Sequence, residues 1–312
     1  MGRLVVSTFH SLAFEGLPTV SPTPFCGLAF EGLVKAVARS GHLLSTADVA
    51  ALRTRDTLSG LLQGSERNFH LFTFDDGYVE HLRAAEILEK HGGAGVFFVP
   101  SSVLSGEMLL VNKIHLLHRA YGRMDKAVAV LEAVGGMALF DRLLTRGREL
   151  MSSIRKGPFD SDVDKALKVA LQQDAQDEPL ASVLHQATEV VLKRMEFEAK
   201  DYYLDRPGLR ALVAAGSIVG GHGVTHRRLT ELTESERAAE LNASKQLIEE
   251  YCSTDMLHFA YPFGSYNVAT EISAVNSDFD VLYTIEEGMN FGDSYNPFRV
   301  QRVDAIRLHD FI

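Results

Sequence analysis

Residues 68–99 read NFHLFTFDDGYVEHLRAAEILEKHGGAGVFFV and contain two strand signals separated by a helix signal. The β-rich run Asn68–Phe74 predicts a buried strand that ends at Asp75-Asp76-Gly77. A helix is expected from about Glu80 to His91, and a second strand over Ala94–Val99. Strand, helix and strand within about thirty residues predict a βαβ unit with a right-handed crossover.

The same alternation recurs toward both ends of the chain. The run Leu4–Phe9 predicts a short buried strand that ends at His10. Further strands are expected over residues 217–220, 256–261, 280–285 and 298–303, and further helices over residues 30–40, 206–215 and 233–251. This alternation implies an α/β fold with a parallel, barrel-like sheet, in which the chemistry lies at the carboxyl ends of the strands.

The segment from about residue 112 to residue 200 has a different pattern. It lacks strand signals and carries two helical stripes, made by Val163, Leu167 and Leu171 and by Leu184, Ala187, Val191 and Met195. We therefore predict a barrel formed by residues 1–111 and 201–312, with a helical insertion over residues 112–200. Two roles fit the insertion: packing or oligomerisation, and a cover over a substrate cleft.

The composition narrows the possible partners. The 312-residue chain has 31 basic and 41 acidic residues, a net charge of −10, and no basic run, so nucleic acid is not expected to bind. Cys26 and Cys252 match no thiolate metal spacing and are interpreted as reduced core thiols, with a disulfide as the alternative. No signal peptide and no apolar run of about 20 residues is found, which predicts a cytoplasmic protein without a transmembrane segment.

The hexapeptide LAFEGL occurs twice, at Leu12–Leu17 and at Leu28–Leu33. The first copy lies in a segment, residues 11–27, whose glycines and prolines predict a loop, and the second largely in an expected helix. Because the contexts differ, we interpret the match as a coincidence and not as a structural repeat.

Several residues of metal-binding and acid–base type lie where strands are expected to end. Asp75 and Asp76 would repel each other unless a divalent cation bound one of them and left the other as a base; a solvated acidic turn is the alternative. His222 and His226 are four residues apart after a glycine-rich strand end, so both can face one metal. After Pro262, exposed backbone N–H groups are candidates for an oxyanion site, and an ordinary strand exit is the alternative.

Together these pieces resemble the polysaccharide deacetylase family, also called the NodB-homology class or carbohydrate esterase family four. Thr73-Phe-Asp-Asp-Gly-Tyr78 is similar to the family's first signature, the pair His222 and His226 to the second, and Pro262-Phe263-Gly264 to the third. The resemblance implies a distorted (β/α)₇ TIM-like barrel with one divalent metal ion, zinc or a similar ion.

The resemblance also implies a role for each matching residue. Asp76, His222 and His226 would be the metal ligands, and Asp75 the general base that activates water. Phe263, through its backbone N–H, and Tyr78 would face the oxyanion and the substrate.

Two departures from the family's pattern concern catalytic groups. Most relatives have an arginine in the third signature, where this chain has Ala260, and Arg302 is the candidate to replace it from another strand. Most relatives also take their acid, a histidine, from near the carboxyl end. A permuted branch takes it instead from an opening strand that ends in an aromatic residue and a histidine, as Phe9-His10 does here. We therefore favour His10 over His309 as the acid.

The expected function is hydrolysis of the amide bond of an N-acetylated amino sugar. A cytoplasmic location favours a small nucleotide-linked, lipid-linked or glycoside substrate. An O-acetyl esterase and an N-deformylase are alternatives because the same metal and base would serve them. A non-catalytic sugar-binding relative is a third class of function, although such relatives usually lack the base or a ligand.

Overall fold

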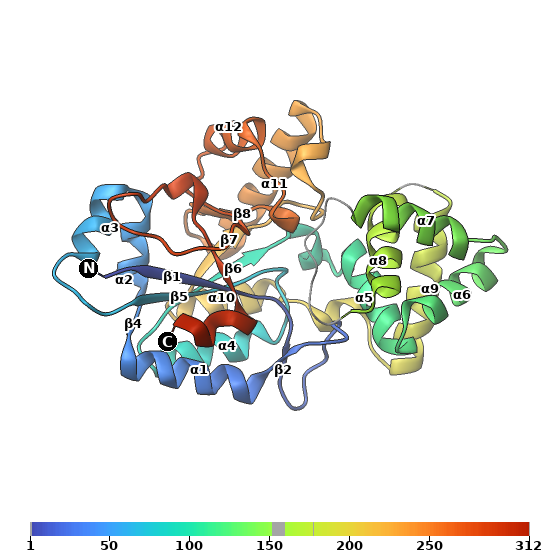
Figure 1. Ribbon diagram of the computed structural model, residues 1–312, viewed down its shortest axis with the longest axis horizontal. Coiled ribbons are helices and arrows are strands. Elements are labelled where there is room, and N and C mark those ends of the chain that lie inside the picture. The colour runs from blue at the N-terminus through green and yellow to red at the C-terminus, as the bar shows by residue number, and fades with distance from the viewer. Residues whose placement is uncertain (1, 152–159, 177, 312) are drawn as a thin grey trace. The chain divides into compact units, whose positions relative to one another are not determined.

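The computed structural model describes residues 2–151, 160–176 and 178–311. These residues form two compact units. The barrel unit comprises the described residues of 1–17, 25–107 and 203–312, and the helical unit those of 18–24 and 108–202. Figure 1 labels the strands of the barrel unit and the helices of both units.

The barrel unit is built on a parallel sheet. Seven strands pair in the order β10-β1-β5-β6-β7-β8-β9, β4 lies beside β5, and β2 and β3 form a separate pair. Val300 bridges Tyr283 of β9, while Val303 of β10 pairs with Ser7 of β1. The short segment of residues 300–303 therefore contacts both β9 and β1 of the curled sheet. The strands are β1 (Leu4–Phe9), β2 (Leu12–Ala13), β3 (Phe25–Cys26), β4 (His42–Leu43), β5 (Phe69–Phe74), β6 (Gly95–Val99), β7 (Ile218–Gly221), β8 (His258–Ala260), β9 (Val281–Tyr283) and β10 (Val303–Asp304).

Helices alternate with these strands along the chain. The helices of the barrel unit are α1 (Gly27–Ser40), α2 (Thr46–Val49), α3 (Arg55–Leu62), α4 (His81–Lys90), α10 (Arg206–Ala214), α11 (Glu234–Cys252) and α12 (Val268–Asn276). Those of the helical unit are α5 (Leu110–Tyr121), α6 (Met124–Gly135), α7 (Phe140–Met151), α8 (Asp162–Asp174) and α9 (Leu180–Met195). Short 3₁₀ turns lie at Ala50–Arg53, Ser101–Ser105, Ala199–Tyr202, Leu229–Glu231, Pro262–Gly264, Pro297–Arg299 and Ala305–Phe311.

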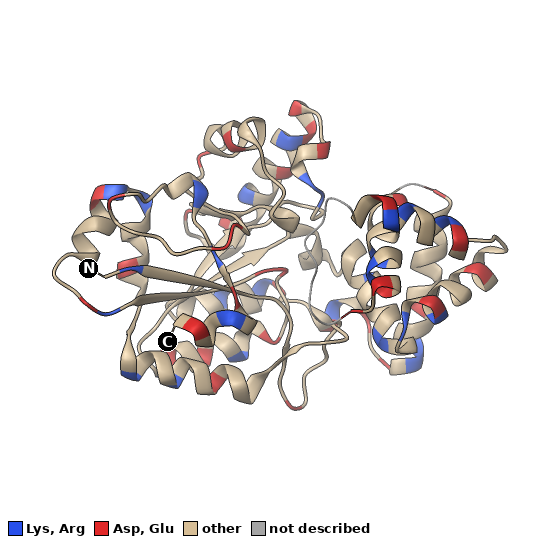
Figure 2. Cartoon of the chain, viewed as in Figure 1, with Lys and Arg blue, Asp and Glu red and all other residues tan. Residues whose placement is uncertain are grey.

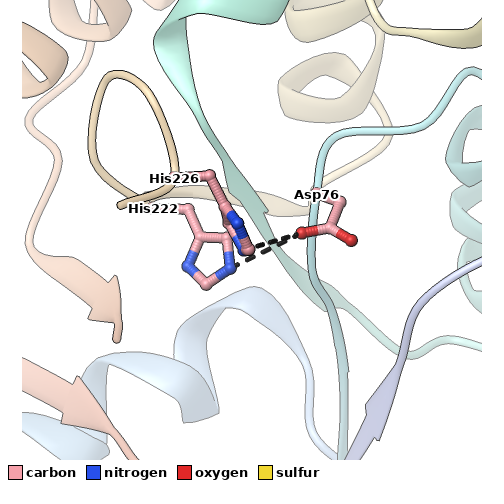
Figure 3. A group of neighbouring side chains, drawn as sticks. All are labelled: Asp76, His222 and His226. Atoms are coloured by element: carbon pink, nitrogen blue, oxygen red, sulfur yellow. Dashed lines mark ion pairs between the residues drawn. The ribbon is translucent and has the colours of Figure 1, made fainter. Parts of the chain in front are cut away.

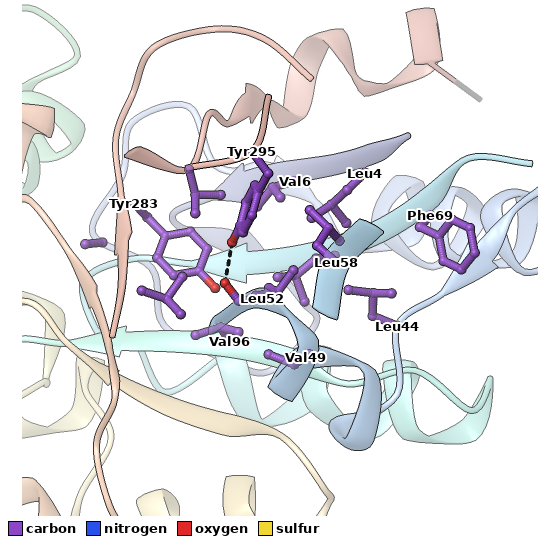
Figure 4. Packing of buried hydrophobic residues seen from close by; sticks show 14 of the residues in the cluster. Leu4, Val6, Leu44, Val49, Leu52, Leu58, Phe69, Val96, Tyr283 and Tyr295 are labelled. Atoms are coloured by element: carbon purple, nitrogen blue, oxygen red, sulfur yellow. Dashed lines mark hydrogen bonds between the residues drawn. The ribbon is translucent and has the colours of Figure 1, made fainter. Parts of the chain in front are cut away.

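The strands at the centre of the barrel unit are apolar almost throughout because they are buried. All six residues of β1 and all six of β5 are buried, as expected for parallel strands covered on both faces. A cluster of buried side chains from strands, helices and the C-terminal segment packs together in Figure 4. Within it the hydroxyl of Tyr295 donates to the carbonyl of Leu52 (2.7 Å), so the one polar group of that ring is satisfied.

The helical unit contains no strand among its described residues. The stripe residues Leu167 and Leu171 of α8 and Leu184 and Val191 of α9 are buried. α7 and α8 approach so closely at Gly147 that a Cβ there would overlap the carbonyl oxygen of Ala166. In the described part of the chain, no helix is long and apolar enough to cross a membrane.

Some expectations from local pattern are wrong in detail. The strand expected over residues 298–303 is replaced by the turn Pro297–Arg299, the bridge at Val300 and β10. The side chain of Asn296 accepts from the N–H of Phe298, and proline lacks the N–H that a strand would use, so the chain turns there. The loop expected over residues 11–27 contains β2 and β3. Cys26 is exposed rather than part of the core, and both cysteines are free.

Basic and acidic residues are interspersed over both units in the view of Figure 2.

Candidate active site

Two parallel strands bring His10 and the aspartate pair together. β1 and β5 pair in register, with Phe9 opposite Phe74, and the N–H of Asp75 donates to the carbonyl of Phe9 (2.9 Å). The residues that follow these strands, His10 and Asp75-Asp76, therefore lie side by side at the carboxyl end of the sheet.

Asp76 faces two imidazoles from the segment that follows β7. Its Oδ1 lies 3.7 Å from Nε2 of His222 and 3.3 Å from Nε2 of His226. One ligand atom from each of the three side chains lies within 4.8 Å of the other two. Figure 3 shows both rings pointing at the same carboxylate oxygen.

The chemistry of this triad fits a divalent cation. Nδ1 of His222 donates to the carbonyl of Ala260 (2.7 Å), which leaves its Nε2 as an acceptor. Burial lowers the pKa of both imidazoles, that of His226 to about 3, so both are neutral at pH 7 and cannot neutralise Asp76. Oδ1 of Asp76 is buried and makes no hydrogen bond within the described residues. A buried carboxylate in this state is costly unless a cation binds it.

Asp75 has a different partner, the buried guanidinium of Arg302. The two side chains make a bidentate pair, with Nη1 to Oδ1 at 2.7 Å and Nη2 to Oδ2 at 2.9 Å. Nε of Arg302 donates to the carbonyl of Thr284 (2.8 Å), which fixes the guanidinium. Burial by itself would raise the pKa of Asp75, but Arg302, with help from His222 and His10, outweighs it and holds that pKa well below the usual range.

Of the two candidate acids, the structure places His10 beside the carboxylates. Its Nε2 is 3.8 Å from Oδ2 of Asp75, and its side chain is 57% exposed. His309 is 73% exposed, and its ring contacts Asp310 and the carbonyl of Ile306.

Tyr78 and Phe263 occupy different places. Tyr78 was expected to face substrate, but it is only 2% exposed and its hydroxyl donates to Oδ2 of Asp76 (2.9 Å). Burial raises the pKa of Tyr78 well above its ordinary value, so the hydroxyl keeps its proton and remains a donor. The ring of Phe263 lies 4.6 Å from that of His226, and the guanidinium of Arg228 lies 4.1 Å from its centre.

Three residues of the site have left-handed backbone: Asp76 (φ 78°), His226 (φ 60°) and Phe263 (φ 57°). Non-glycine residues rarely adopt positive φ because Cβ then approaches a carbonyl oxygen. Strain of about 1–3 kcal/mol per residue persists only where the surrounding structure enforces it, and such residues cluster at functional sites.

Glu240 is a buried residue of α11 that holds the histidine loop and that no sequence motif points to. Its Oε2 accepts from the N–H groups of Val224 (2.7 Å) and Thr225 (3.0 Å), and its Oε1 from the hydroxyl of Thr225 (2.5 Å). Gly223 has φ 76°, and a Cβ there would lie 2.9 Å from Oε2 of Glu240. Glu240 therefore fixes the loop between His222 and His226.

Comparisons with known proteins found a family model and solved structures that are similar to this chain. A family model described as polysaccharide deacetylase matches residues 183–281, which include His222, His226 and Phe263. The Streptococcus pyogenes deacetylase PplD in complex with acetate is 13% identical over 99% of this chain and 97% of that chain, with a TM-score of 0.58. IcaB from Ammonifex degensii is 16% identical over 97% of this chain and 91% of that chain, with a TM-score of 0.56.

A de-N-acetylase from Aggregatibacter actinomycetemcomitans is 11% identical over 99% of this chain and all of that chain, with a TM-score of 0.56. No curated protein sequence matches the chain. At these identities the structural likeness shows the fold, and the expectation of a (β/α)₇-type barrel is confirmed.

Proposed function

Because this chain belongs to the polysaccharide deacetylase family, we propose that it is a metal-dependent hydrolase that removes the N-acetyl group of an amino sugar. The proposal rests on one observation: a buried cluster of two neutral imidazoles and the Asp76 carboxylate, an arginine-held carboxylate and an exposed imidazole meet at the carboxyl end of the barrel strands. Metal-assisted amide hydrolysis would use each of these groups.

Asp76, His222 and His226 would hold the cation. Two imidazoles and one carboxylate suit Zn²⁺, and three protein ligands leave a position open for chemistry. When bound, the ion would polarise the acyl carbonyl and lower the pKa of the attacking water to about 7. Tyr78 would hold the ligand carboxylate in place through its hydrogen bond to Oδ2.

Asp75 would accept the proton of the water as it attacks the acyl carbon. Its lowered pKa keeps it ionised at neutral pH, and the bidentate contact with Arg302 fixes its oxygens. The backbone N–H of Phe263 would support the oxyanion that develops on the acyl oxygen.

His10 would protonate the departing amine. The sugar nitrogen is a poor leaving group as an anion, so it must gain a proton as the C–N bond breaks. An imidazole beside the base can supply this proton. Hydrolysis of an ester with a good leaving group does not need such an acid. The position of His10 thus favours an N-acyl over an O-acyl substrate and supports placing the chain in the permuted branch. We propose a small N-acetylated sugar, nucleotide-linked, lipid-linked or glycosidic.

Acetate release from a panel of N-acetylated sugars, measured together with bound metal, tests the function. The wild-type protein is expected to bind about one divalent ion per chain and to lose activity on chelation. Asp76→Ala should lose the metal. Asp75→Asn should keep it while turnover falls by about 10²–10⁴-fold, because a general base is removed. Full metal occupancy in Asp76→Ala would exclude Asp76 from the ligand set.

The acid is tested by comparing two substrates. In His10→Ala, amide turnover should fall by about 10²–10⁴-fold, whereas turnover of an activated phenyl ester, whose leaving group needs no proton, should change far less. His309→Ala is the matched control and should leave both rates near those of the wild type. Equal losses on both substrates in His10→Ala would contradict the assignment.

A further inference from the structure

Four consecutive residues around His10 are hydrogen-bonded to the segment that carries the aspartate pair. The carbonyl of Phe9 accepts from the N–H of Asp75 (2.9 Å). The carbonyl of His10 accepts from Nε2 of His81 (3.0 Å). The hydroxyl of Ser11 (2.9 Å) and the N–H of Leu12 (3.3 Å) both donate to Oε1 of Glu80. None of these bonds involves the side chain of His10.

His81 is built as a permanent donor. Its ring is fully buried and packs against those of Phe74, Tyr78 and Phe97. Burial lowers its pKa to about 4, so the ring is neutral at pH 7, and the contact with a carbonyl places the proton on Nε2. Its Nδ1 makes no hydrogen bond within the described part of the chain. Leaving a buried ring nitrogen without a hydrogen bond costs free energy.

Glu80 is the N-cap residue of α4 and His81 its first residue, five positions after Asp75 and Asp76 respectively. The short segment of residues 75–81 therefore positions both the base and the segment that carries the acid. His10 needs such support, because its side chain is largely exposed and its contact with Asp75 is long, at 3.8 Å. The position of its ring depends on where its backbone is held.

We propose that His81, assisted by Glu80, is a positioning residue that fixes the backbone of His10 so that its imidazole stays within reach of Asp75 and of the departing amine. This inference rests on the proposed function of His10 as the acid. His81 touches no reacting atom and acts only through His10.

The test is a double-mutant cycle. His81→Phe keeps the ring volume and removes the donor, and amide turnover should fall by about 10–100-fold, because displacement of a catalytic group by about 1 Å has that cost. Ester turnover and metal content should change little, and His81→Gln, which retains a donor, should recover part of the loss. In a His10→Ala background, His81→Phe should cause no further loss of amide turnover. His91→Phe, at the other end of α4, is the matched control.

An equal loss on amide and ester, or a full additional loss in the His10→Ala background, would overturn the inference. If the wild-type protein releases no acetate from any sugar, the proposed function fails, and hydrogen exchange then tests His81 independently. Exchange in the peptide spanning residues 9–17 should be faster in His81→Phe than in the wild type and His91→Phe. Unchanged exchange would mean that His81 does not hold this segment.

Discussion

Two neighbouring aspartates with the same side chain have different surroundings in this protein. Asp75 faces a guanidinium that keeps it ionised and fixed, while Asp76 faces neutral imidazoles and a tyrosine hydroxyl. The first environment suits a base and the second a metal ligand. Asp75 continues directly from β5 and its N–H donates to the carbonyl of Phe9, whereas Asp76 has left-handed backbone (φ 78°), so the two adjacent carboxylates face different partners.

The pair of Asp75 and Arg302 leads to a stability prediction. Arg302→Met leaves the buried carboxylate unpaired, which should lower the free energy of unfolding by about 3–5 kcal/mol. Adding Asp75→Asn removes the unpaired charge and should recover part of that loss. Urea unfolding of the single and double variants measures both values. Additive losses would show that the two side chains do not interact.

At the scale of elements, helix α11 supports the histidine loop through Glu240. The helix begins with the capping box formed by Thr233 and Glu236, and this local contact sets the helix start. The contact between Glu240 and residues 224–225 then depends on how the helix packs against the end of β7. The positions of His222 and His226 therefore depend on α11, which lies outside the motif that contains the two histidines.

Glu240→Gln tests this dependence. The amide has one acceptor oxygen in place of two, so either the two backbone N–H groups or the hydroxyl of Thr225 lose their acceptor. The Kd for Zn²⁺ should rise by about 10–100-fold, as is typical for residues that orient metal ligands. Metal titration against a competing chelator measures it, with Glu250→Gln, an exposed residue of the same helix, as the control. An unchanged Kd would leave Glu240 with only a structural role.

At the scale of the whole molecule, buried neutral histidines make folding depend on pH. His258 of β8 is buried, Nδ1 lies 2.9 Å from the hydroxyl of Tyr283, and burial lowers its pKa to about 4. The unfolded chain takes up this proton near pH 6.5. The contribution to stability is therefore complete above about pH 6.5 and decreases as the pH falls toward 4.

Between pH 7 and pH 5, His258 should account for a loss of about 2 kcal/mol in the free energy of unfolding. His258→Phe removes this titration, so its stability should fall less over the same interval, even though the variant starts from a lower value. Urea unfolding at both pH values gives the two slopes. His185→Phe, at an exposed histidine of α9, should keep the slope of the wild type.

Much of the barrel follows from the sequence alone. Buried apolar runs and glycine ends predict β1, β5, α4 and β6 closely, because strand burial and helix termination depend on neighbouring residues. The resemblance to the polysaccharide deacetylase family, carried by Thr73–Tyr78, His222, His226 and Pro262–Gly264, anticipated the fold that the comparisons confirm. The roles of those residues and of His10 and Arg302 stay predictions that the variants above test.

Other features were decided only by tertiary structure. The hexapeptide LAFEGL forms β2 and a turn at Leu12–Leu17 but lies within α1 at Leu28–Leu33, so identical residues adopt the structure that their surroundings allow. Tyr78 turns inward to Asp76, and Arg302 reaches Asp75 across 227 positions of sequence. Such contacts depend on strand register and on how elements pack, and no local pattern encodes the register between segments that meet only after the chain has folded.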